Sequence, residues 1–194
     1  MTAVVILAGG EGRRIGGDKP GRLLGGERLL DRALAQARGW SSLVAISSSN
    51  AQPFADEPGI ASLADASDRG PIAGIAAALK FARTSGVGHV MTISCDTPFL
   101  PPDLPDRLHR ALTASTAAAM ASSGGRLHPT CALWRVTTID DLAAYLATGR
   151  ASLHGFAESI GAVAVEWPID PVDPFFNINA ASDLAAAEAL LKSR

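Results

Sequence analysis

Two hydrophobic patterns alternate along the chain. Short apolar runs, typical of buried strands, cover residues 4–7, 43–47, 61–65, 89–95, 117–121, 128–134 and 162–167. Between them, apolar residues recur at helical spacing over residues 27–38, 71–83, 101–112, 139–146, 153–160 and 182–190. This alternation predicts an α/β protein: a three-layer α/β/α sandwich with a Rossmann-like, mostly parallel sheet, in a single domain over residues 1–194.

The first apolar run leads directly into glycines and cations. Gly9 and Gly10 follow the run, and Arg13, Arg14 and Lys19 come soon after. Glycine lets a turn bring backbone N–H groups close to an anion, and the cations add charge for the same anion. The stretch therefore favours phosphate binding by the backbone of Leu7, Ala8, Gly9 and Gly10 with Arg14 and Lys19, although a surface loop with solvated charges stays open.

Two familiar phosphate loops are excluded by spacing. Pro20 follows Lys19 where a P-loop needs Ser or Thr, and the glycines do not form G-x-G-x-x-G.

Aspartates follow two other apolar runs. Asp96 ends the run over residues 89–95, and Pro98 stops further strand pairing. Carboxylates at the carboxyl end of a parallel strand are well placed to hold Mg²⁺, so we expect Asp96 to be a metal ligand and not merely a turn cap. Asp65 ends the run over residues 61–65, and Asp68 follows it closely.

Composition narrows the function classes. The net charge of −2 argues against a broad nucleic-acid surface, and two distant cysteines form neither a disulfide framework nor a zinc pattern. Neither a signal peptide nor an apolar run long enough for a membrane span is apparent. We therefore expect a cytoplasmic protein without membrane or nucleic-acid partners, and expect it to be a monomer.

The motifs together resemble one family. The first loop reads L-A-G-G, then R-R-I-G-G-D-K, and is followed by G-P-I-A-G at Gly70, C-D-T-P at Asp96, H-P-T at His128 and F-F-N-I-N ending at Asn179. This set is similar to the molybdenum cofactor guanylyltransferases, the MobA family, within the NTP-transferase superfamily. The resemblance implies a nucleotide-diphospho-sugar-transferase type of fold.

The resemblance also implies an activity and roles for residues. GMP would pass from GTP to the terminal phosphate of molybdenum–molybdopterin, with Mg²⁺ as cofactor and pyrophosphate as product. Catalytic roles would belong to Arg14, Lys19 and Asp96. Nucleotide contacts would include the first loop, Lys19, Ser47, Asp65, Gly70 and Asp96. Among these, Asp65 would be the carboxylate that contacts the nucleoside, with Asp68 in reserve. Acceptor contacts would include Arg126, His128, Asn177 and Asn179. Asn177 and Asn179 alternate, so the chain pattern also places them on one face of an extended segment.

Other functions stay open at this point. A relative could use CTP or a sugar phosphate, and a non-catalytic protein could bind the nucleotide or cofactor and deliver it. Proteins that deliver or receive the cofactor are further candidate partners.

Two local details are also predicted. Gly124 and Gly125 predict a hairpin turn, and Ser182 is the expected N-cap of the last helix.

Overall fold

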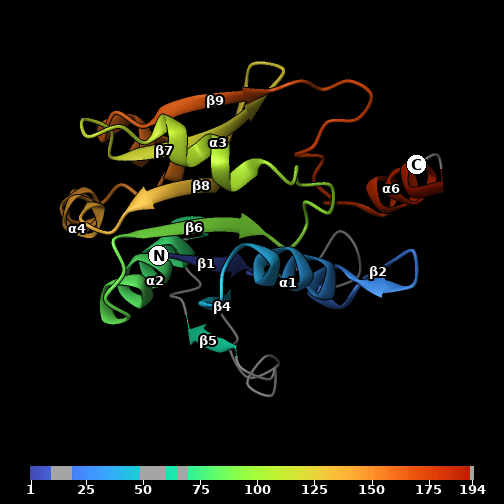
Figure 1. The fold of residues 1–194 in the computed structure, drawn as a ribbon, viewed down its shortest axis with the longest axis horizontal. Coiled ribbons are helices and arrows are strands. Elements are labelled where there is room, and N and C mark those ends of the chain that lie inside the picture. Colours follow the sequence, from blue (N-terminus) through green and yellow to red (C-terminus); the bar gives the residue numbers. More distant parts are fainter. Residues whose placement is uncertain (10–18, 49–59, 65–69, 193–194) are drawn as a thin grey trace.

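A seven-stranded sheet forms the centre of the molecule (Figure 1). The computed structural model describes residues 1–9, 19–48, 60–64 and 70–192. The sheet has the order β5-β4-β1-β6-β8-β7-β9, and only β8 runs against the others within this set. The strands are β1 (Thr2–Leu7), β4 (Val44–Ser48), β5 (Ala61–Ala64), β6 (His89–Ser94), β7 (Ala118–Ser123), β8 (Arg126–Arg135) and β9 (Val163–Trp167).

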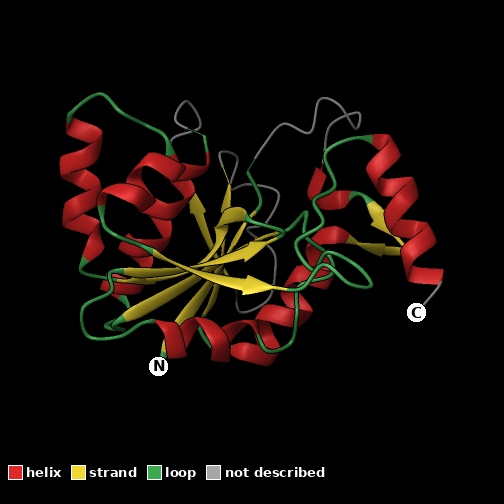
Figure 2. Ribbon diagram, turned by 90° about the horizontal axis from the view of Figure 1, so that it is seen from above, coloured by secondary structure: helices red, strands yellow, loops and turns green. Residues whose placement is uncertain are grey.

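Helices cover both faces of this sheet, as Figure 2 shows from above. One face carries α1 (Leu29–Trp40) and α3 (Leu104–Ala111). The other carries α2 (Pro71–Thr84), α4 (Thr138–Ala147) and α5 (Leu153–Ser159). The predicted three-layer sandwich with a mostly parallel sheet is thus confirmed.

The alternation of side chains along β1 shows why two helical layers are needed. Val4 and Ile6 pack into the cluster under α1 and α3, whereas Ala3, Val5 and Leu7 pack into the cluster on the opposite face. Successive side chains of a strand point to opposite faces, so a run that is apolar at every position must be covered twice.

A small group of elements lies beyond the carboxyl ends of the central strands, outside the two helical layers. It contains the 3₁₀ turn η2 (Lys19–Gly21), the short strands β2 (Leu23–Leu24) and β3 (Glu27–Arg28), and the last helix, α6 (Ala181–Lys192). Leu24, Leu29, Phe99, Ile178 and Ala187 form its buried core. The sequence interpretation missed this hairpin and began the first helix at Glu27; Glu27 and Arg28 instead pair with Leu23 and Leu24.

The predicted turn at Gly124 and Gly125 joins β7 to β8, and both glycines have positive φ, 55° and 75°. Such angles suit a two-residue hairpin and cost a glycine little.

The predicted N-cap of α6 is wrong. The helix begins at Ala181, before Ser182, and the Asp183 carboxylate instead accepts the N–H groups of Asn179 and Ala180, each at 2.8 Å.

Candidate functional site

The carboxyl ends of three parallel strands are level with one another. Leu7 of β1 stands beside Ser47 of β4 and Ser94 of β6. Beyond this row, the Cys95 N–H donates to the Leu7 carbonyl at 3.2 Å and the Ala8 N–H donates to the Ser47 carbonyl at 2.8 Å. The sheet therefore continues as far as Ala8 and Cys95 and presents Gly9 and Asp96 at its rim.

Three residues predicted to contact the nucleotide lie at this rim. The Ala8 N–H is used by the sheet, so it is not a free donor for a phosphate. Ser47 is completely buried, and its carbonyl accepts that same N–H at the carboxyl end of β4. Leu7 is also buried within the strand. Gly10, Arg14 and Asp65 lie outside the described residues, as does the reserve candidate Asp68.

Lys19 and Asp96 meet in a buried ion pair. The Lys19 Nζ donates to Asp96 Oδ2 and also to the Asn179 Oδ1, the latter at 2.9 Å. The side chains of Lys19 and Asp96 are each 11% exposed, so both charges have little water and depend on each other. One ammonium group thus contacts two residues that lie 77 and 160 positions after Lys19 in the chain, Asp96 and Asn179.

Asp96 keeps one oxygen without a partner. Its Oδ1 is buried and has no hydrogen bond among the described residues, while Oδ2 accepts from Lys19. A buried carboxylate oxygen without a donor is costly, and a hard cation or a ligand donor would satisfy it. Within the described part of the chain, no group of three or more His, Cys, Asp or Glu side chains could enclose a metal ion.

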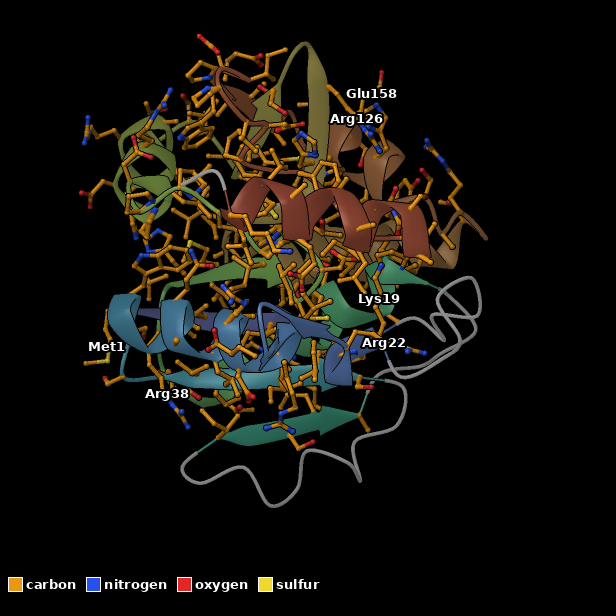
Figure 3. The ribbon with its side chains drawn as sticks, turned by 90° about the vertical axis from the view of Figure 1, so that its right-hand side faces the viewer. Met1, Lys19, Arg22, Arg38, Arg126 and Glu158 are labelled. Atoms are coloured by element: carbon orange, nitrogen blue, oxygen red, sulfur yellow. The ribbon has the colours of Figure 1, made fainter. Side chains whose placement is uncertain are left out.

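The segment that carries Asn179 is fixed on both sides. The Ile178 N–H donates to the Asp96 backbone carbonyl at 3.0 Å, which ties this segment to the end of β6. The Asp183 carboxylate accepts from the Asn179 and Ala180 N–H groups, and these bonds hold the pKa of Asp183 below its ordinary value. Figure 3 shows Lys19 on one side of α6 and Arg126 on the other.

Beside the ion pair lies a cavity of about 210 Å³. It is lined by polar groups and two phenylalanines: Thr97, Arg126, His128, Thr130, Cys131, Asp173, Phe175, Phe176, Asn177 and Asn179. All four residues expected at an acceptor site, Arg126, His128, Asn177 and Asn179, line this one cavity. Asn179 also accepts from Lys19, so it belongs to both the ion pair and the cavity.

His128 is half-buried and packed against an aromatic ring. Its imidazole stacks on Phe175 with 4.8 Å between ring centroids, and Trp167 meets the same phenylalanine edge-on at 5.4 Å. Burial lowers the pKa of His128, with a smaller lowering by Arg126 that opposes the effects of Asp173 and Glu166. The imidazole is therefore neutral at pH 7 and is a hydrogen-bonding group, not a cation.

Some cavity residues carried no signal that sequence reasoning used. Thr97 and Thr130 stand within the C-D-T-P and H-P-T motifs but were given no role of their own, and Asp173 was not singled out. No periodic pattern marks Asp173, because residues 173–176 form a turn in which the Phe176 N–H donates to the Asp173 carbonyl at 3.1 Å. The Asp173-Pro174 pair is the turn signal at this position.

Three further predictions can be placed. Gly70 precedes α2 with φ of 63°, and a side chain there would meet nothing within 4 Å, so its glycine requirement lies in the backbone angle. Cys95, which precedes Asp96, is buried, and burial raises its thiol pKa to about 12, which makes it a poor nucleophile. In the described part of the chain, no helix is both long and apolar enough to cross a membrane.

Comparison with known proteins gives a consistent result. The model of the MobA-like NTP transferase domain matches residues 4–162. A molybdenum cofactor guanylyltransferase of Cereibacter sphaeroides is 44% identical over 97% of this chain and 96% of its own length. Proteins with the same description from Acidiphilium cryptum and Rhizobium leguminosarum are 42% and 39% identical, covering 95% and 98% of this chain and 93% of each relative.

Solved structures share the fold. The molybdopterin-guanine dinucleotide biosynthesis protein A of Archaeoglobus fulgidus superposes with a TM-score of 0.80 at 24% identity, over 100% of both chains. The 4-diphosphocytidyl-2C-methyl-D-erythritol synthase of Anaerococcus prevotii gives 0.78 at 15% identity, over 99% of this chain and 96% of the other.

Proposed function

The chain belongs to the MobA-like NTP transferases, and on that premise we propose that it is a molybdenum cofactor guanylyltransferase. It transfers GMP from GTP to the terminal phosphate of molybdenum–molybdopterin. The products are the guanine dinucleotide form of the cofactor and pyrophosphate. In this proposal the enzyme works as a cytoplasmic monomer.

The observation that carries the proposal is the double contact of Lys19. Its ammonium group touches Asp96 at the end of β6 and Asn179 at the rim of the cavity. A triphosphate over the ion pair and an acceptor in the cavity would therefore lie next to each other. That adjacency is what a transfer between two phosphorylated molecules requires.

The chemistry is a displacement at phosphorus. An oxygen of the acceptor phosphate forms a bond to the α-phosphorus of GTP, and the bond from that phosphorus to the β-phosphate oxygen breaks. Pyrophosphate leaves with the electron pair. The acceptor phosphate is already ionised at pH 7, so no side chain has to remove a proton, which agrees with a neutral His128 that serves as a ligand contact and not as a base.

The main obstacle is repulsion between the reactants, because both are anions. Lys19 reduces that repulsion from a site with little water, where a charge acts more strongly than at the surface. Arg14 would add a second cation from the first loop. Asn179 holds Lys19 and at the same time lines the cavity, so it aligns the two ligands.

The donor set fits Mg²⁺. Asp96 Oδ1 is buried and lacks a partner among the described residues, and Mg²⁺ commonly uses one or two carboxylates together with substrate phosphates and water. Asp96 would hold the ion, which would neutralise charge on the triphosphate when bound.

The test is a product analysis with the purified protein, Mg²⁺, molybdenum–molybdopterin and an equal mixture of GTP and CTP. We expect mass spectrometry to find the guanine dinucleotide in large excess and pyrophosphate in equal amount. A cytidine product would reassign the base. Binding of GTP without release of pyrophosphate would replace the enzyme by a delivery protein.

A further inference from the structure

A chain of hydrogen bonds leads away from His128 to a carboxylate. The His128 Nε2 lies 2.8 Å from the Ser123 Oγ, and this hydroxyl donates to Asp173 Oδ1 at 2.8 Å. The same Asp173 oxygen accepts the Phe175 N–H at 2.9 Å. Ser123 is 3% exposed, so its hydroxyl has little access to water as an alternative partner.

The number of available protons determines which group donates in each of these hydrogen bonds. An ionised carboxylate only accepts hydrogen bonds, and a serine hydroxyl has a single proton. Ser123 gives that proton to Asp173, so its oxygen must accept from His128. The proton of the neutral imidazole is therefore on Nε2.

The other ring nitrogen is then an acceptor. In a neutral imidazole one nitrogen carries the proton and the other carries a lone pair. The Nδ1 of His128 has no hydrogen-bond partner among the described residues, and the ring lines the cavity. Stacking on Phe175 holds the plane of the ring, with 21° between the two planes.

The surrounding groups do not reverse this assignment. Arg126 faces the ring from β8, Asp173 from the segment before Asn177, and Glu166 from β9. Burial is the largest influence on the pKa of His128 and lowers it, so the second proton is absent at neutral pH.

We propose that Ser123 and Asp173 are positioning residues that hold His128 as the Nε2–H tautomer, so that Nδ1 accepts a hydrogen bond from an N–H group of the acceptor's heterocycle. The inference deepens the proposed function and rests on it for the identity of the ligand. It assigns His128 to the ring of the acceptor and leaves Arg126 as the cavity side chain suited to an anion.

The tautomer can be measured without turnover. Two-dimensional NMR of imidazole ¹⁵N nuclei distinguishes Nε2–H, Nδ1–H and doubly protonated rings. The chain has four histidines, so the signal that disappears in His128→Phe identifies this ring. We expect Nε2–H for His128 in the wild type at pH 7.5.

Variants of the two supporting residues test the cause. In Asp173→Ala the Ser123 proton is released and can turn toward Nε2, so we expect the population to move to Nδ1–H. Asp173→Asn keeps a carbonyl oxygen in place and should retain Nε2–H. Ser123→Ala should leave a mixture of both tautomers.

Steady-state kinetics tests the ligand contact. Loss of one hydrogen bond should raise the KM for molybdenum–molybdopterin about three- to tenfold in Ser123→Ala and Asp173→Ala, with the KM for GTP unchanged and Asp173→Asn close to wild type. Ser122→Ala is the matched control, because Ser122 is equally buried and donates to the Glu166 carboxylate but makes no hydrogen bond to His128 among the described residues.

The outcomes separate this inference from the proposed function. An Nδ1–H or doubly protonated ring in the wild type overturns the inference even if the enzyme is active. A shifted tautomer with an unchanged acceptor KM overturns the ligand contact. A wild type that makes no guanine dinucleotide refutes the proposed function and removes the acceptor from the inference, while the NMR result still decides the role of Ser123 and Asp173.

Discussion

The ion pair at the sheet edge and the neighbouring cavity are held in place by different physics. Lys19 and Asp96 are opposite charges with little water, and one oxygen of the carboxylate is left unsatisfied. The cavity is organised by a neutral histidine, stacked rings and hydroxyl groups. In the proposed function the two regions would have different roles: the ion pair would balance negative charge, and the cavity would recognise the shape and hydrogen-bonding groups of a ring.

The strongest test of this division removes the charge of Asp96. Asp96→Asn keeps the volume of the side chain but weakens both the Lys19 contact and any metal contact. We expect GTP-dependent pyrophosphate release to fall by about 10³, the upper end of the range found when a group that stabilises a transition state is lost. Near-wild-type turnover at saturating Mg²⁺ would contradict the metal assignment.

Lys19→Met is the second test, and it has two expected results. Turnover should fall by about 10², because one cation for the triphosphate is missing. In the nucleotide-free protein, however, Mn²⁺ should bind more tightly than in the wild type, because Asp96 no longer shares its charge with Lys19. Electron paramagnetic resonance titration of Mn²⁺ measures this directly. Equal or weaker affinity would show that Lys19 does not compete for Asp96.

Phe175→Leu changes the cavity and leaves the ion pair in place. The variant keeps an apolar side chain but loses the stacking on His128 and the edge contact with Trp167. Each aromatic pair contributes about 0.5–1.5 kcal/mol, so we expect the acceptor KM to rise about tenfold while the KM for GTP stays unchanged. A parallel rise in both constants would mean that the two regions are not separable.

A smaller effect is expected at the hairpin that follows Lys19. Gly25 has φ of 61°, and a Cβ there would lie 3.1 Å from a Leu191 methyl group and 3.2 Å from the Arg32 guanidinium. Gly25→Ala should lower the free energy of unfolding by about 1–2 kcal/mol. Gly26→Ala is the control, because φ is 82° but nothing lies within 4 Å, so the difference between the two variants isolates crowding against Leu191 of α6 and Arg32 of α1. Urea unfolding measures both.

The smallest effect concerns pH and the neutral histidines. Burial lowers the pKa of His89, His109 and His128 below the ordinary value of 6.5. The unfolded chain therefore binds protons first as pH falls, so stability is full above pH 6.5 and declines as pH falls from there toward the folded-state pKa values. Thermal unfolding at pH 7.5 and 5.5 should show a decline that is shallower in His128→Phe than in His154→Asn, a variant of an exposed histidine on α5.

The folding stability should decline a second time at lower pH. Accepting the Ser122 hydroxyl lowers the pKa of Glu166 from its ordinary 4.5, so its contribution is lost only as pH falls below that value. Glu166→Gln should therefore alter the profile only in this more acidic range, which separates the carboxylates from the histidines.

The sequence predicted the layers of the fold well because β1, β4 and β6 are apolar on both faces, which only a covered parallel sheet explains. It did not predict the β2–β3 hairpin, because four paired residues are too few for a periodic pattern. It also placed Ser182 at a cap that Asp183 makes from inside the helix. Which residue caps the helix depends on how the preceding segment is held. The Asp96 carbonyl holds that segment by accepting the Ile178 N–H, a contact between residues far apart in the chain.

Some residues of the candidate site could likewise be found from the sequence, whereas the roles of others depend on the fold. Lys19, Asp96, His128 and Asn179 stood in recognisable motifs, and the structure brings them to one end of the sheet. The sequence interpretation could not assign Ser123 and Asp173 a role, because their roles depend on a register between β7 and β8 and on a loop that approaches from the other end of the chain.

The contact of Lys19 with Asn179 also has a consequence for synthesis. The two residues are 160 positions apart, so at roughly 5–20 residues per second the ribosome needs about 8–30 seconds after Lys19 to make its partner. Until then the emerging sheet carries an ammonium group and a carboxylate without the segment that aligns them. The nascent protein should therefore bind nucleotide poorly for most of its translation and become competent only near the end.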